Sequence, residues 1–265
     1  MSEPIKIARG RFLQSAMITA AALQTAALGV AKASETETVR NVVLVHGLYA
    51  DGSCWADVIV PLQAAGLRVT AVQNPLTSFA EDVAAVRRAI AMQDGPTVLA
   101  AHSYGGMVAS EAGVDPKVTA LVYIAARAPD AGEDYLALAK RFPAPPASAQ
   151  LVRFDEYLQL SESGFLNDFA NGIDTQRAKA LYAVQQPNVA TLSPMARTSV
   201  AAWRSKPSWY AVSKQDRTID PDLERFMAQR MKATTIEIDA GHLSIVSHAQ
   251  VVANLILAAS GRKAG

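Results

Sequence analysis

The chain has 265 residues, of which 50% are hydrophobic, so it is long enough and apolar enough to build a buried core. A formal net charge of +1 argues against nucleic acid as a partner, since no strongly basic surface is available. Cys54 is the only cysteine, so no intrachain disulfide forms, and no Cys/His spacing is typical of a metal or haem site. We expect a folded protein that needs no cofactor or metal.

The first 33 residues differ in composition from the rest. Lys6, Arg9 and Arg11 precede an alanine-rich apolar run over 12–30, and residues 31–33 match an A-x-A cleavage site. The alternative is a membrane anchor, but polar residues interrupt the run at Gln14, Ser15, Thr19, Gln24 and Thr25. We therefore predict an export signal over 1–33 and a main domain over 34–265, which is periplasmic or secreted and not stably inserted in a membrane.

After this segment, short apolar runs alternate with helical patterns. The predicted strands cover 41–47, 67–73, 96–103, 117–126, 208–213 and 234–240, and most are apolar on both faces. Segments of helical length and periodicity cover 53–65, 79–93, 105–113, 220–232 and 247–259. This order predicts an α/β fold with a mostly parallel, doubly wound sheet.

The interval from about 129 to 207 has no strong strand pattern, several prolines, and amphipathic stretches around 134–141, 153–170 and 174–185. We interpret it as an inserted helical cap. The alternative, a disordered loop, fits poorly because the interval is rich in large apolar side chains that can anchor it.

A candidate nucleophile stands in the stretch "LAAHSYGG", residues 99–106. Ser103 follows a predicted strand and precedes a predicted helix, the context of a G-x-S-x-G nucleophile elbow. Ala101 occupies the position of the first glycine, but it adds only a methyl group where strand and helix pass closely. We interpret A-x-S-x-G as a tolerated variant of the elbow.

A serine nucleophile requires a base and an acid, which follow it in the order Ser, Asp, His in this arrangement. His242 comes directly after the last predicted strand and is the expected base, whereas His248 fits a helix start or a surface position. Asp216 lies nearest the end of strand 208–213 and is the expected acid. Asp220 fits a helix N-cap, and Asp239 precedes the base too closely to turn back on it.

The oxyanion formed during acyl transfer needs two backbone donors. We expect the N–H of Tyr104, at the start of the elbow helix, and that of Leu48, in the loop after the first strand. His46, at the end of that strand, is expected to be structural.

These motifs resemble the α/β-hydrolase superfamily, and more narrowly the branch of plant salicylate-type methylesterases, hydroxynitrile lyases and related bacterial esterases. The resemblance covers 41–128 and 207–259 and rests on stretches such as "VLVHGLYADGSCW", "AHSYGGMVASEA" and "EIDAGHLSIVSH". Within this branch the lyases carry threonine at the position of Gly47 and lysine at that of Leu243, so the resemblance implies an esterase. Ser103 also differs from the carboxylate nucleophile of dehalogenases and epoxide hydrolases.

The sequence therefore predicts a serine carboxylic-ester hydrolase that acts through an acyl-enzyme on a small ester. Trp55, Trp203 and Trp209, with the aromatic residues of the cap, suggest an apolar substrate, although each also fits plain core packing. Two alternatives stay open: a cofactor-free lyase or perhydrolase with the same triad, and a non-enzymatic ligand-binding protein.

Overall fold

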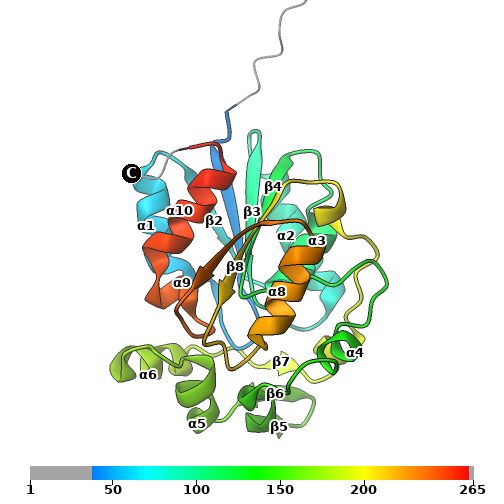
Figure 1. The fold of residues 1–265 in the computed structure, drawn as a ribbon, viewed down its shortest axis with the longest axis vertical. Coiled ribbons are helices and arrows are strands. Elements are labelled where there is room, and N and C mark those ends of the chain that lie inside the picture. Colours follow the sequence, from blue (N-terminus) through cyan, green and yellow to red (C-terminus); the bar gives the residue numbers. More distant parts are fainter. Residues whose placement is uncertain (1–37, 263–265) are drawn as a thin grey trace, which may run out of the picture. The chain divides into compact units, whose positions relative to one another are not determined.

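A six-stranded sheet forms the centre of the computed structural model, which describes residues 38–262 (Figure 1). Its strands are β1 (Asn41–Val45), β2 (Arg68–Val72), β3 (Thr97–His102), β4 (Val118–Ile124), β8 (Ser208–Ser213) and β9 (Thr234–Ile238). They run in the order β2-β1-β3-β4-β8-β9, and every neighbouring pair is parallel. The predicted doubly wound α/β fold is confirmed. The predicted export signal lies outside the described residues.

Two layers of helices cover the sheet because its strands are apolar on both faces. Successive residues alternate between two core clusters: Val43 and Val45 belong to one, Val42 and Leu44 to the other. The first cluster includes residues of α2 (Phe79–Ala91), α3 (Gly105–Ala112) and α8 (Pro221–Arg230). The second includes residues of η1 (Gly52–Trp55), α1 (Ala56–Ala64), α9 (Ser244–Ser247) and α10 (Ala249–Ala259).

Side chains at the helix starts fix where the helices of the sheet begin. The Ser78 hydroxyl accepts from the Glu81 N–H at the start of α2. Asp220 accepts from the N–H groups of Asp222 and Leu223, so its predicted role as the N-cap of α8 is confirmed. None of the helices in this part of the chain has both the length and the apolar character needed to cross a membrane.

The inserted cap is mixed rather than helical, which corrects the prediction of a helix around 153–170. Its elements are α4 (Tyr135–Ala139), η2 (Pro146–Gln150), β5 (Leu151–Phe154), β6 (Tyr157–Leu160), α5 (Glu162–Gly164), a π-helical turn η3 (Phe165–Phe169), α6 (Thr175–Ala183), β7 (Asn188–Val189), α7 (Leu192–Met195) and η4 (Ala202–Arg204). Strands β5, β6 and β7 form an antiparallel sheet. Asp155, at φ 49°, turns the β5–β6 hairpin, because aspartate tolerates the left-handed conformation.

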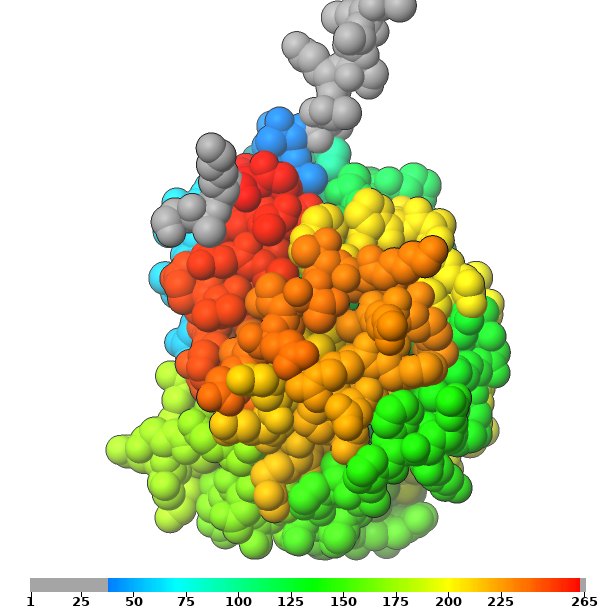
Figure 2. Space-filling model, in the orientation of Figure 1, coloured from blue at the N-terminus to red at the C-terminus, as the bar shows by residue number. Residues whose placement is uncertain are grey.

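The cap lies over the carboxyl ends of the central strands. The Val189 N–H donates to the Leu76 carbonyl after β2, and the Ala147 N–H donates to the Arg217 carbonyl after β8. Figure 2 shows the green cap residues packed against the amber and orange residues of the β8–α8 region. Since loops at the carboxyl ends of parallel strands carry the ligand sites of α/β folds, the cap covers the expected site.

Candidate active site

The turn between β3 and α3 holds Ser103 in a left-handed backbone conformation, with φ of 55°. Residues with a Cβ rarely adopt this region, because the Cβ crowds the following carbonyl. The Ser103 N–H donates to the Ile124 carbonyl (3.3 Å), and the Ser103 carbonyl accepts from the N–H groups of Gly106 (3.0 Å) and Arg127 (2.9 Å). Ser103 therefore has the strained strand-turn-helix geometry of a nucleophile elbow.

Small residues allow the elbow to form. A Cβ on Gly105 would lie 2.7 Å from the carbonyl oxygens of both Val45 and His46, so only glycine fits where α3 begins. Ala101 is paired in the sheet between Val45 and Tyr123 and is fully buried. Its methyl group packs in the core cluster, and the elbow keeps its geometry with alanine at this position.

The structure brings Asp216 and His242 together below the cap. Asp216 lies in the turn after β8, where its Oδ1 accepts from the N–H groups of Thr218 (2.6 Å) and Ile219 (2.9 Å). Its Oδ2 lies 2.5 Å from His242 Nδ1, and both side chains are fully buried. Because Asp216 acts here as an acceptor, we assign the proton to His242 Nδ1, which leaves Nε2 with a free lone pair.

His242 Nε2 is buried and has no hydrogen-bond partner among residues 38–262. No hydrogen bond connects this nitrogen to Ser103. The residue before Ser103, His102, makes the contact with His242 instead. His102 Nε2 lies 3.0 Å from the His242 carbonyl oxygen, and the two rings are 4.6 Å apart. The elbow and the loop that carries His242 are thus held side by side. Burial lowers the pKa of His102 well below its usual value, so its ring is neutral.

An aromatic side chain of the cap covers the His242 ring. Phe169, in the π-helical turn, lies 5.1 Å from this ring and makes an edge contact with Tyr49 at 6.0 Å. Phe169 is itself buried. This packing shields the histidine from water, which strengthens its interaction with Asp216.

The loop after β1 lies directly against Ser103. A Cβ on Gly47 would come within 2.6 Å of Ser103 Cβ and 3.1 Å of Ser103 Oγ. Leu48 follows Gly47, and Tyr104 follows Ser103, so the two predicted oxyanion donors belong to segments that meet at the serine. Both residues are buried.

His46 fixes the shape of this loop. Its Nε2 accepts from the Asn74 N–H at 2.9 Å, so its Nδ1 is the protonated nitrogen, which lies 2.9 Å from the Gly47 carbonyl oxygen. The Asn74 side-chain amide also donates to the His46 carbonyl at 3.0 Å. Burial lowers the pKa of His46 and keeps it neutral. These contacts agree with the predicted structural role.

The alternative acid and base of the sequence analysis lie elsewhere. Asp239 is exposed and accepts from the Gln215 side-chain amide, with the Lys214 ammonium 3.6 Å away. His248 lies at the start of α10, where its Nδ1 is 2.9 Å from Ser247 Oγ. In the described part of the chain, no three His, Cys, Asp or Glu side chains gather where they could hold a metal ion.

Glu224 of α8 is a buried acid beside Asp216 that sequence reasoning missed. It is fully shielded from solvent, its Oε2 accepts from the Ser213 N–H at 3.1 Å, and its Oε1 is buried without a hydrogen-bond partner among residues 38–262. Burial has the largest effect on the pKa of Glu224 and the charge of Asp216 the second largest. Both raise this pKa well above its usual value. A glutamate inside an amphipathic helix gives no signal of this position, because most such residues face solvent.

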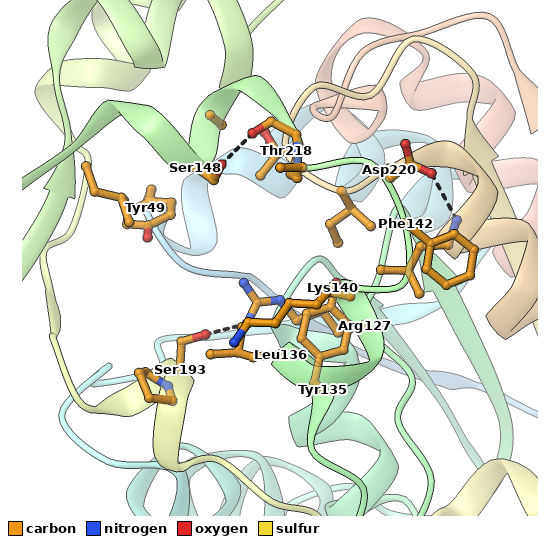
Figure 3. Close-up of a pocket in the computed structure, with 18 of the residues that line it drawn as sticks. Tyr49, Arg127, Tyr135, Leu136, Lys140, Phe142, Ser148, Ser193, Thr218 and Asp220 are labelled. Atoms are coloured by element: carbon orange, nitrogen blue, oxygen red, sulfur yellow. Dashed lines mark hydrogen bonds between the residues drawn. The ribbon is translucent and has the colours of Figure 1, made fainter.

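A cavity of about 560 Å³ lies between the cap and the sheet (Figure 3). Neither Ser103 nor His242 lines it, but three loops around Ser103, Asp216 and His242 do, through Tyr49, Arg127 and Thr218. The cap adds mostly apolar side chains, among them Tyr135, Leu136, Phe142, Leu158 and Leu160. Contrary to the sequence-based suggestion, none of the three tryptophans lines the cavity: Trp55, Trp203 and Trp209 pack in or against the core clusters.

A family model described as the alpha/beta hydrolase family matches residues 42–255. The chain belongs to this family. The matched residues include the elbow, the cap and the loops that carry Asp216 and His242. The family resemblance noted from the sequence motifs is thereby confirmed.

Similar proteins include enzymes named as esterases. A carbendazim-hydrolysing esterase of Nocardioides sp. (strain SG-4G) is 32% identical over 128 residues, 42% of this chain and 52% of that protein. Methylesterase 7 of Arabidopsis thaliana is 34% identical over 107 residues, 34% of this chain and 41% of that protein. The chain thus matches about half of the length of these relatives. Methylesterase 8 of the same plant is 23% identical over 248 residues, 85% of this chain and 91% of that protein.

Two solved structures illustrate the shared fold. A pyrethroid hydrolase is 21% identical with a TM-score of 0.68, and the match covers 82% of this chain and 95% of that chain. Polyneuridine aldehyde esterase is 18% identical with a TM-score of 0.71, over 83% of this chain and 98% of that chain. At these identities the comparison shows the fold alone.

Proposed function

We propose that the protein is a serine carboxylic-ester hydrolase. His242 Nε2 takes the proton of the Ser103 hydroxyl as Oγ attacks the ester carbonyl, and Asp216 stabilises the imidazolium that results. The backbone N–H groups of Leu48 and Tyr104 bind the oxyanion. His242 then protonates the leaving alcohol, and an acyl-enzyme on Ser103 remains.

Hydrolysis of the acyl-enzyme repeats these roles with water as the nucleophile. His242 takes a proton from the water molecule as its oxygen attacks the acyl carbon, and returns the proton to Ser103 Oγ as the acid departs. No cofactor takes part. The nucleophile, acid and base follow one another along the chain in the order Ser, Asp, His, as in other members of the fold.

The observation that carries this proposal is the buried hydrogen bond of 2.5 Å between His242 Nδ1 and Asp216 Oδ2. It orients a histidine whose other nitrogen is unpartnered, next to a serine held in the strained elbow conformation. The esterase and methylesterase relatives support the same reaction class. The mostly apolar lining of the cavity supports a small ester with an apolar body as substrate.

The test is hydrolysis of p-nitrophenyl acetate and butyrate by the protein and by its Ser103→Ala variant. We expect turnover by the wild type and none above background by the variant, whose circular dichroism and melting temperature match the wild type. A fluorophosphonate probe labels Ser103 in the wild type only. Retention of most activity by Ser103→Ala rejects the proposal.

The position after His242 favours an esterase over a cyanohydrin lyase. Leu243 is buried in a core cluster, so the residue after His242 supplies no cation that could stabilise a cyanide leaving group. Cyanohydrin cleavage, measured beside ester hydrolysis, distinguishes the two activities. The same assay with acetate and peroxide tests for a perhydrolase.

We also propose that residues 1–33 direct export and are then removed. The support is the sequence pattern of a basic segment, an apolar run and an A-x-A site. Mass spectrometry of the protein recovered from the periplasmic fraction tests this. A mature N-terminus at Ser34 supports the proposal, and an intact chain confined to the cytoplasm rejects it.

A further inference from the structure

Arg127 places an unneutralised cation in the wall of the cavity. It stands three residues after the end of β4, and its backbone N–H donates to the Ser103 carbonyl. Its Nη1 donates to Ser193 Oγ at 2.8 Å, and its guanidinium carbon lies 4.7 Å from the centre of the Tyr135 ring. Its Nε is buried with no partner, and within residues 38–262 no carboxylate forms an ion pair with it.

The surroundings of Arg127 favour an anion. Lys140, at the end of α4, also lines the cavity and has no ion-pair partner in the described part of the chain. Figure 3 shows the side chains of Arg127, Lys140 and Ser193 directed toward the same part of the cavity. Burial removes part of the water that would hydrate the guanidinium of Arg127, and no counterion replaces that water. A ligand carboxylate could accept hydrogen bonds from the free N–H groups and so compensate for the lost hydration.

One carboxylate of the protein also lines the cavity, and it is engaged elsewhere. Asp220 accepts from the first backbone N–H groups of α8, at 3.0 Å and 3.3 Å, and lies across the cavity from Ser193 in Figure 3. Two cations and one anion leave a net charge of +1 in the lining. This balance matches a ligand with a single negative charge rather than a phosphate with two.

We propose that Arg127, assisted by Lys140 and Ser193, forms a carboxylate-binding subsite, so that the preferred substrates are esters that also carry one free carboxylate, such as monoesters of dicarboxylic acids. This inference rests on the proposed function. The planar guanidinium binds the carboxylate in the cavity, while the apolar side chains of the cap contact the chain between the carboxylate and the ester. The ester group points toward the elbow, to which Arg127 is joined through its backbone.

The first experiment compares two substrates that differ in charge alone. Monomethyl glutarate carries the carboxylate, and methyl glutaramate replaces it with a neutral amide of the same shape. Acid release is followed in a pH-stat at pH 7.5. We expect the wild type to favour the monoanion in kcat/KM by about tenfold to a hundredfold, the range for a hydrogen bond to a charged group.

Variants then assign the preference to Arg127. The ratio of kcat/KM for the two substrates should fall at least about tenfold in Arg127→Met, and Arg127→Lys should retain part of it. Arg88→Met is the matched control, because Arg88 is exposed on α2 and lies outside the cavity lining. Lys140→Met should lower the ratio by a smaller factor.

Binding separates failure of the subsite from failure of the proposed function. Calorimetry with Ser103→Ala measures Kd for both compounds without turnover. Hydrolysis of both substrates with equal kcat/KM overturns the subsite and leaves the esterase intact. If neither is hydrolysed, tighter binding of the monoanion that is lost in Ser103→Ala/Arg127→Met still supports the subsite, and equal or undetectable binding overturns it.

Discussion

Glu224 lies close enough to Asp216 for the charge of one carboxyl group to act on the other, and both carboxyl groups are shielded from solvent. Burial, and after it the charge of Asp216, raise the pKa of Glu224 well above its usual value, because a second negative charge is costly next to Asp216 in a buried place. The hydrogen bond from the Ser213 N–H, and after it the charge of Arg225, which pairs with Glu237, lower the pKa of Glu224 in the opposite direction. The proposed acid of the triad therefore has a second buried carboxyl group beside it.

Replacement of Glu224 by glutamine should change how stability depends on pH. Because the pKa of Glu224 is raised in the folded protein, its contribution to stability is fully present below about pH 4.5 and is lost as pH rises through the folded pKa. Glutamine does not ionise, so the advantage of Glu224→Gln over the wild type should grow by about 1.4 kcal/mol per pH unit within that window. Urea unfolding from pH 5 to 9 measures it. Parallel stability profiles would contradict the prediction.

The contact between Asp216 and His242 predicts the effect of Asp216→Asn. An asparagine amide at this position donates to the ring, which places the histidine proton on Nε2 and removes the base. We expect kcat for p-nitrophenyl acetate to fall by about 10⁴-fold with the fold retained. Asp222→Asn, an exposed change in the first turn of α8, serves as the control. A loss of similar size in the control would show a structural effect.

The contact of Gly47 with Ser103 predicts that Gly47→Ala disturbs the nucleophile. The new Cβ would meet Ser103 Cβ at 2.6 Å, so either the loop after β1 or the elbow must shift. We expect kcat/KM to fall by about 100-fold, the usual effect of a displacement near 1 Å. Gly132→Ala is the comparison: no atom lies within 4 Å of its Cβ, and its φ of +72° limits the effect to a stability loss of about 1–2 kcal/mol.

The packing of Ala101 predicts opposite results for two substitutions. Ala101→Gly should keep activity and lose about 1 kcal/mol of stability, because glycine weakens a strand interior. Ala101→Val adds two methyl groups at a fully buried position and should lower stability by about 1–3 kcal/mol, with loss of activity as the elbow moves. Thermal melts and ester hydrolysis check both. Full activity in Ala101→Val would show that the site has room.

The hydrogen bond from the Tyr104 hydroxyl to Asp82 predicts a pH-dependent loss in Tyr104→Phe. Burial raises the pKa of Asp82 to about 6, so its stabilising contribution is full below about pH 3.8 and is lost as pH rises to about 6. Without the hydroxyl, the ionised carboxylate loses a donor. We expect a deficit of about 1–3 kcal/mol at pH 7 and a smaller one at pH 4.5, where Asp82 is protonated. Equal deficits at the two pH values would disprove this account.

The sheet could be predicted because its strands carry a strong signal. Runs such as residues 41–45 and 97–102 are apolar on both faces, and each predicted strand matches the observed one to within two residues at either end. The proposed triad could be assembled from the sequence because Ser103, Asp216 and His242 lie within four residues after the ends of β3, β8 and β9. In a parallel sheet those three strand ends meet at one edge.

Two features could not be predicted in the same way: the elements of the cap, and the side chains of Arg127 and Glu224 near the candidate site. Strands of four residues, such as Leu151–Phe154, are too short for their period to be separated from that of a helix. Arg127 stands in an irregular segment three residues after the end of β4, where no local pattern shows that its side chain reaches a cavity. The contact of Glu224 with Asp216 depends on how α8 packs on β8, a tertiary arrangement that local pattern does not encode.

The site draws its three side chains from separate parts of the chain, and the last of them follows β9, an edge strand. His242 therefore reaches its place only after β9 has paired with β8 and α10 has packed against α1 behind it. In a ribosome-bound or partly folded chain, Ser103 would therefore lack the histidine that we propose as its base. The time at which ester hydrolysis appears during refolding should therefore report when the last strand and helix have docked. We expect hydrolytic activity to recover later than the far-ultraviolet circular dichroism signal.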